Sequence, residues 1–193
     1  MMKSATGLVA LSVLLAASGP ATAASCEDVT FPDSVQVGGQ SLVLNGLGLR
    51  EATMFNVSVY VAALYNGGQT MDGGAVINDA GPRRLVLHFV RDVDGGDIAE
   101  AFEDGFEANN DGATMDAIGD RVGQLNGWME DMAEGEVMTF DAVPGEGLSV
   151  TVRGADKGLV EGDDFIPAFL AIWFGDEPPN DGLKDGLLGG ECG

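Results

Sequence analysis

The sequence predicts an α+β domain in which a large antiparallel sheet is covered on one side by helices. Strand-like runs fill residues 28–92, and the longest alternates in side-chain character with a period of two. After residue 97 the apolar period lengthens to about 3.6, which is typical of amphipathic helices. No Pro/Ser-rich linker or internal repeat divides the 193 residues. Strands first and helices grouped afterwards favour one α+β domain.

Residues 1–23 have the pattern of a secretory signal peptide. Lys3 gives a positive start, residues 8–17 form a short apolar run, and Ala21-Thr22-Ala23 is a small-residue cleavage site. The run is too short for a membrane span. Residues 24–193 are therefore expected to form the domain of a periplasmic or secreted protein. A loose lipobox at residues 23–26 leaves a lipoprotein as the alternative.

The strands come first along the chain. Gly38-Gly39 separates two of them and predicts a hairpin turn. A glycine-rich loop over residues 66–74 follows the long strand, and Gly81-Pro82 precedes the last strand of this half. The predicted strands are residues 28–31, 34–37, 40–44, the run ending at 65, and 84–92.

The second half contains helices and one further hairpin. Asp97 is the predicted N-cap of the first helix, and Gly175 is expected to end the third. The predicted helices are residues 97–109, 114–132, 163–174 and 181–188, with a hairpin of strands 136–142 and 148–153 between the second and third helices.

The long strand is the element most indicative of function. Odd-numbered residues 55–65 would share a core-facing side, and even-numbered residues 56–62, with Tyr60, the more polar side. Arg50 shortly precedes this stretch. A cation near a buried sheet in so acidic a protein is expected to have an anionic partner. That partner is either a ligand or a carboxylate of the protein itself, such as Glu51.

Composition excludes several classes of function. The chain has 31 acidic and 9 basic residues and a formal net charge of −22, so nucleic acid would be repelled. There is no CxxC motif and no Cys/His cluster, so a structural zinc site is not expected. The acidic clusters at residues 92–97 and 109–112 lack the ligand spacing of an EF-hand calcium loop, so no metal and no cofactor is expected. Cys26 and Cys192 stand at opposite ends of the mature chain and predict one disulfide in an oxidising compartment. The alternative is two unpaired thiols at frayed ends.

Four segments carry a resemblance that spans nearly the whole mature chain. They are NGLGLREATMFNVSVYVAALY, GPRRLVLHFVRDV, a helix ending in FEANN, and DDFIPAFLAIWFGDEPPNDGLKDGLLG. Together they resemble the exported bacterial branch of the chalcone isomerase-like family. This resemblance implies an open-faced β-sandwich with a ligand cleft between the sheet and a layer of helices. The family includes plant enzymes that cyclise chalcones to flavanones, and fatty-acid-binding relatives.

The resemblance also assigns positions to a site. Arg50 matches the family's arginine, and Tyr60 stands where a strand threonine helps to bind the enone oxygen. Phe102 replaces a tyrosine at the start of the covering helix. Asn109 matches an asparagine, with Asn110 as a competing match. The late threonine that fixes substrate specificity falls near Ile172.

The cation is thus retained while most hydrogen-bond donors of the enzyme are lost. The resulting hypothesis is a non-catalytic binder of a small amphipathic anion, such as a fatty acid, held by Arg50 and Tyr60. One alternative is an isomerase, an intramolecular lyase acting on a phenolic or enone substrate with Arg50 as its electrostatic catalyst. Another is a structural or partner-binding protein with a filled cleft.

Overall fold

The computed structural model describes residues 23–52 and 57–192, and its centre is a seven-stranded antiparallel sheet. The predicted signal peptide lies almost entirely outside the described residues, as do Phe55 and Asn56. The sheet runs β3-β4-β5-β6-β7-β8-β9, so strands that follow each other in sequence are neighbours in space. Its strands are Ser34–Val37, Gln40–Ala52, Val57–Asn66, Arg83–Phe89, Val137–Val143, Gly147–Val152 and Ala155–Glu161. A separate hairpin is formed by β1 (Ala23–Cys26) and β2 (Val29–Pro32).

Two-residue turns with positive φ connect several of these strands. Gly38 and Gly39, with φ of 54° and 75°, join β3 to β4 and confirm the predicted hairpin. Arg153 and Gly154, with φ of 52° and 76°, join β8 to β9 in the same way. Such turns match the right-handed twist of the flanking strands, and a connection of two residues can join only antiparallel strands.

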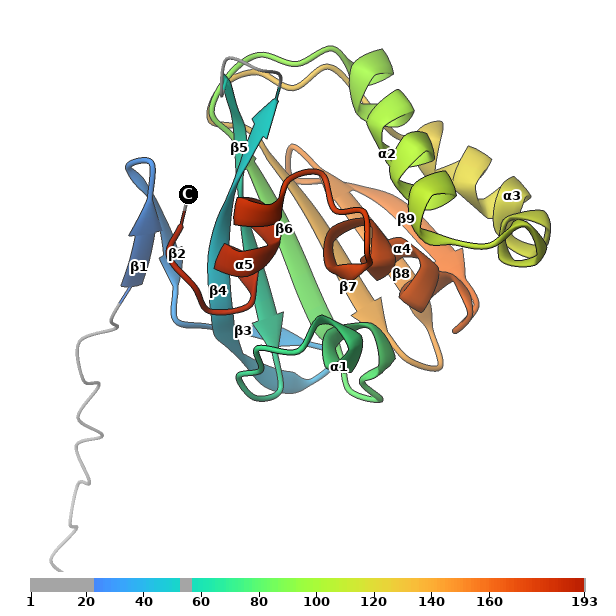
Figure 1. The fold of residues 1–193 in the computed structure, drawn as a ribbon, viewed down its shortest axis with the longest axis horizontal. Coiled ribbons are helices and arrows are strands. Elements are labelled where there is room, and N and C mark those ends of the chain that lie inside the picture. The colour runs from blue at the N-terminus through green and yellow to red at the C-terminus, as the bar shows by residue number, and fades with distance from the viewer. Residues whose placement is uncertain (1–22, 53–56, 193) are drawn as a thin grey trace, which may run out of the picture.

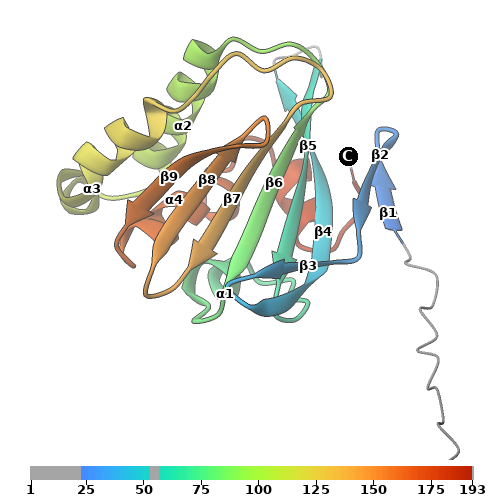
Figure 2. The ribbon, with the colours of Figure 1, turned by 180° about the vertical axis from the view of Figure 1, so that it is seen from behind.

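Five helices complete the fold (Figure 1). The central one, α4, is buried on almost every side, while α2 and α3 have one apolar face each. Seen from behind, none of the described helices lies over β6–β9, so the predicted one-sided α+β architecture is confirmed (Figure 2). Among the described residues, none of the helices is long and apolar enough to cross a membrane. The helices are α1 (Gly73–Asn78), α2 (Gly95–Asn109), α3 (Gly112–Asn126), α4 (Phe165–Phe174) and α5 (Asp181–Leu187).

The sheet carries an apolar core on each face. Tyr60, Ala62 and Leu64 of β5 point into the larger core beneath the helices. Val61 and Tyr65 point into a smaller core that includes residues of the β1–β2 hairpin. The expectation of one apolar and one polar face on this strand is therefore wrong. The second face is also buried, because it packs with residues of the β1–β2 hairpin and of strands β3 and β4.

The C-terminal segment is bonded to β1 and packs on β4. Cys26 and Cys192 form the predicted disulfide, with their Cα atoms 6.0 Å apart. Figures 1 and 2 both show the last described residues of the chain beside the β1–β2 hairpin. A Cβ atom on Gly46 or Gly48 of β4 would collide with backbone oxygens of α5. The two glycines therefore let α5 lie directly on the strand that carries Arg50.

Several elements differ from the sequence prediction. β1, β9 and α1 were not predicted, and the N-cap of α2 is Asp94, so Asp97 lies in the first turn. Helix α3 ends at Asn126, although the predicted helix reaches residue 132. Met129 and Met132 still pack on the core beyond the helix end, which explains why the apolar pattern continues.

Candidate functional site

A cavity of about 710 Å³ opens between one end of the sheet and helices α2 and α4. β4, β5 and β6 supply one wall, the two helices supply another, and the segment after α4 closes a third side. The part of the lining that is buried is apolar or aromatic and comprises Tyr60, Leu87, Phe89, Ile98, Phe102, Ile172 and Trp173. A cavity of this size and lining is typical of a small-molecule site.

Arg50 is half-buried on β4 and lines this cavity. It pairs directly with Tyr60 of β5, so both side chains lie on the same face of the sheet. A bulge between Arg50 and Glu51 shifts the register only after this pair. The Nη1 atom of Arg50 donates to the backbone oxygen of Glu51. Among the described residues, no carboxylate forms an ion pair with Arg50.

Asn180 fixes the backbone on both sides of Arg50. Its Nδ2 donates to the oxygen of Leu49 at 3.1 Å, and its Oδ1 accepts from the backbone nitrogen of Glu51 at 3.2 Å. β3 pairs with β4 only as far as Val43, so the outer edge of β4 is unpaired here. The side-chain amide of Asn180 therefore takes the place of a neighbouring strand and holds Arg50 at the cavity wall.

Tyr60 is buried, and its burial raises the pKa of its phenol to about 12. The hydrogen bond from Trp173 and the charge of Arg50 act in the opposite direction and lower the pKa. The Nε1 atom of Trp173 lies 3.1 Å from the Tyr60 hydroxyl oxygen. The phenol is therefore neutral at ordinary pH and available for hydrogen bonding beside Arg50.

Phe102 of α2 and Ile172 of α4 both line the helical side of the cavity. The ring of Phe102 packs edge-to-face on Trp173, with centroids 5.6 Å apart. Ile172 fits against Gly105 of α2, where a Cβ atom would lie 2.7 Å from an Ile172 methyl carbon. Both side chains are apolar, so this wall offers packing and no hydrogen bonds.

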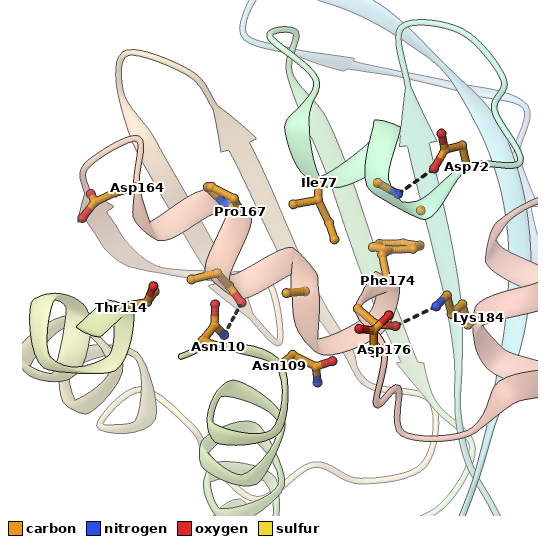
Figure 3. Close-up of a pocket in the computed structure, with 15 residues that line it drawn as sticks. Asp72, Ile77, Asn109, Asn110, Thr114, Asp164, Pro167, Phe174, Asp176 and Lys184 are labelled. Atoms are coloured by element: carbon orange, nitrogen blue, oxygen red, sulfur yellow. Dashed lines mark hydrogen bonds between the residues drawn. The ribbon is translucent and has the colours of Figure 1, made fainter. Parts of the chain in front are cut away.

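Asn109 lies apart from the other predicted site residues. It borders a second cavity of about 720 Å³, between α1, α4 and the junction of α2 with α3 (Figure 3). Its Nδ2 donates to the backbone oxygens of Gly105 and Glu177, and its Oδ1 accepts from the Glu177 nitrogen at 2.9 Å. Asn110 is also engaged, donating to Phe106 and Ala168. Both asparagines thus tie helices and loops together.

Charged side chains surround the mouth of the Arg50 cavity. Arg91 is exposed there, and so are five acids: Asp92, Asp94, Asp97, Asp104 and Glu177. Across residues 23–52 and 57–192, no three His, Cys, Asp or Glu side chains are placed to hold a metal ion. The mouth of the cavity is therefore rich in negative charge.

The structure brings four of the five predicted ligand-binding residues to one cavity: Arg50, Tyr60, Phe102 and Ile172. Trp173 and Asn180 were not predicted to act there. Trp173 is a buried aromatic of the core, and its hydrogen bond to Tyr60 joins residues 113 positions apart in the sequence. Asn180 follows two prolines in a loop, and no local pattern indicates that it binds β4.

Comparisons with known proteins agree with this architecture. A family model described as chalcone isomerase-like matches residues 23–189. Among curated proteins, no sequence matches the chain. The fold is similar to the crystal structure of a fatty-acid binding protein of Arabidopsis thaliana, with a TM-score of 0.63 and 15% sequence identity. The similarity covers 86% of this chain and 96% of the plant chain.

Proposed function

The protein belongs to the chalcone isomerase-like family, and from this premise we propose that it is a non-catalytic binder of a small amphipathic anion, such as a fatty acid. The observation that carries the proposal is the pairing of Arg50 and Tyr60 at the wall of an apolar cavity. No carboxylate among the described residues pairs with Arg50, so the guanidinium is available to a ligand.

The chemistry of the cavity suits such a ligand at both ends. A carboxylate would accept hydrogen bonds from Arg50 and Tyr60, each worth about 1.5–3 kcal/mol when one partner is charged. The alkyl chain would lie among Phe89, Phe102 and Ile172, where each buried methylene contributes about 0.8 kcal/mol. The alkyl chain of the ligand therefore supplies most of the affinity, and its carboxylate sets its orientation in the cavity. The similar plant structure is that of a fatty-acid binding protein, which agrees with this proposal.

We also propose that the protein works outside the cytoplasm, in the periplasm or after secretion. The signal-peptide pattern of residues 1–23 supports this. The Cys26–Cys192 disulfide supports it independently, because such bonds persist in oxidising compartments. The bond closes a loop of more than 160 residues.

The alternative functions fit the cavity less well. Cyclisation of a chalcone needs donors that stabilise negative charge developing on the enone oxygen. Phe102 and Ile172 stand at two of the family's polar positions and donate nothing. A purely structural role would fit a cleft filled by side chains, whereas about 710 Å³ is open beside Arg50.

Native mass spectrometry of protein purified from its exporting host tests the proposal. We expect bound species whose masses match fatty acids, released on denaturation and identified by extraction. Protein that carries no acid and also fails to bind added dodecanoate would contradict the proposal. Turnover of a panel of enones that collapses in Arg50→Ala would instead identify the isomerase.

A further inference from the structure

The acceptor capacity of the Tyr60 hydroxyl is used by Trp173. An indole N–H can only donate, so across the 3.1 Å contact Trp173 is the donor and the Tyr60 oxygen the acceptor. The ring of Trp173 is held by edge-to-face packing on Phe102 and by Phe169, with centroids 5.6 and 5.0 Å away. The chemistry of the indole therefore fixes the direction of this hydrogen bond, and the packing of the ring fixes its position.

The hydrogen of the Tyr60 hydroxyl has no acceptor among the described residues. Arg50, on the facing strand, has donors only and cannot receive it. Tyr65, on the opposite face of the same strand, is a useful contrast. Its hydroxyl donates to the backbone oxygen of Pro32 at 3.0 Å. Tyr65 is satisfied within the protein, whereas Tyr60 retains a donor at the cavity wall.

We propose that Trp173 is a positioning residue that commits the Tyr60 hydroxyl to donate into the cavity, so that the site selects head groups made of acceptor oxygens. This inference rests on the proposed function and specifies its selectivity. A carboxylate satisfies both Tyr60 and Arg50 without bringing a donor of its own. A primary alcohol also accepts from Tyr60, but its own hydrogen finds no acceptor in Arg50, which has donors only, or in the Tyr60 oxygen, which already accepts from Trp173.

Accepting a hydrogen bond strengthens the bond that the same hydroxyl donates. The indole of Trp173 thus polarises the phenol in the direction that favours an anion. Removing the indole N–H has two effects on Tyr60. The phenol becomes a weaker donor, and its oxygen becomes free to accept from an alcohol.

The test compares dodecanoate with 1-dodecanol by titration calorimetry in wild type, Trp173→Phe, Tyr60→Phe and the double variant. We expect Trp173→Phe to reduce the preference for dodecanoate over dodecanol by about fivefold to tenfold, the effect of one hydrogen bond. In a Tyr60→Phe background the same change should leave the preference unaltered, because Trp173 acts through the hydroxyl. Trp128→Phe, at a half-buried tryptophan beside Gly158, is the matched control.

A change in packing caused by Trp173→Phe should weaken the binding of dodecanoate and of dodecanol equally. It therefore cancels in the ratio of the two dissociation constants. An unchanged ratio in a Trp173→Phe protein that still binds dodecanoate would therefore overturn this inference alone. Failure of wild type to bind dodecanoate would overturn the proposed function as well.

A ligand-free measurement covers the case in which Trp173→Phe does not fold. In Tyr60→Phe, the indole N–H resonance of Trp173 should move upfield in a ¹H–¹⁵N spectrum, while that of Trp128 stays in place. A Trp173 resonance that does not move would show that the bond is absent in solution and would overturn the inference.

Discussion

Two cavities of nearly equal volume lie on different sides of α4. They differ in whether the polar side chains that line them already have hydrogen-bond partners within the protein. In the cavity of Figure 3, Lys184 donates to the Gly175 oxygen at 2.6 Å, and Asp72 accepts from the backbone of α1. Asn109 and Asn110 are likewise bonded to the backbone. In the Arg50 cavity, Arg50 and Tyr60 keep donors that no described residue accepts.

The two cavities are therefore alike in volume, and the unused hydrogen-bond donors of Arg50 and Tyr60 favour the Arg50 cavity as the proposed binding site. A polar group that already has its partners gains little from a ligand, because it would exchange one hydrogen bond for another. A buried donor that lacks a partner gains the full bond when an anion arrives. The comparison predicts that changes in the Arg50 cavity alter binding, and changes in the other cavity alter stability.

The largest expected effect is on affinity. Arg50→Met should weaken dodecanoate binding by about tenfold to a hundredfold, which corresponds to the loss of a charge-assisted hydrogen bond. Lys184→Met removes a cation of the other cavity and should leave the affinity unchanged. Titration calorimetry of the two variants provides the measurement. Equal losses in both would show that the net charge of the protein, rather than the position of Arg50, governs binding.

The sequence predicted the fold well where the side-chain pattern is local. Period-two and period-3.6 patterns located β3, β6, α2 and α4 to within a few residues. They missed β9, because its first residues, Ala155-Asp156-Lys157-Gly158, have low strand propensity and Gly158 has a φ of 129°. That strand exists because Arg153-Gly154 returns the chain along β8.

The site was predicted in part for a similar reason. Arg50 and Tyr60 share a face because they are directly paired across two antiparallel strands, a relation that parity along one continuous stretch does not encode. Asn109 borders the other cavity because it stands at the last residue of α2, where its amide meets the loop after α4. The contacts of Trp173 and Asn180 depend on how distant segments meet, which no local pattern encodes.

The second prediction concerns stability. Asn109→Ala should lower the free energy of unfolding by about 1–3 kcal/mol, because three hydrogen bonds to Gly105 and Glu177 are lost. Dodecanoate affinity should change by less than about twofold. Asn78→Ala is the matched control, since its one bond, to the Gly74 oxygen, is exposed. Urea unfolding supplies the free energies of unfolding. A large loss of dodecanoate affinity in Asn109→Ala would contradict this prediction and show that Asn109 takes part in binding.

The smallest expected effect comes from the charges at the mouth of the Arg50 cavity. Five exposed acids there outnumber Arg50 and Arg91, and the whole chain carries a formal charge of −22. An approaching carboxylate is therefore repelled until it reaches Arg50, and salt screens this repulsion, with a Debye length of about 10 Å at 0.1 M. Raising the salt from about 10 to 100 mM should speed dodecanoate association by about twofold to fivefold.

The same increase in salt should leave the association of 1-dodecanol nearly constant, because the alcohol is neutral. Asp97→Asn with Asp104→Asn removes two of the five acids and should reduce the salt dependence for dodecanoate. Stopped-flow measurements give both rates. Association of dodecanoate that slows as salt is added would contradict this prediction. It would show that attraction to Arg50 and Arg91, rather than repulsion by the five acids, governs entry to the cavity.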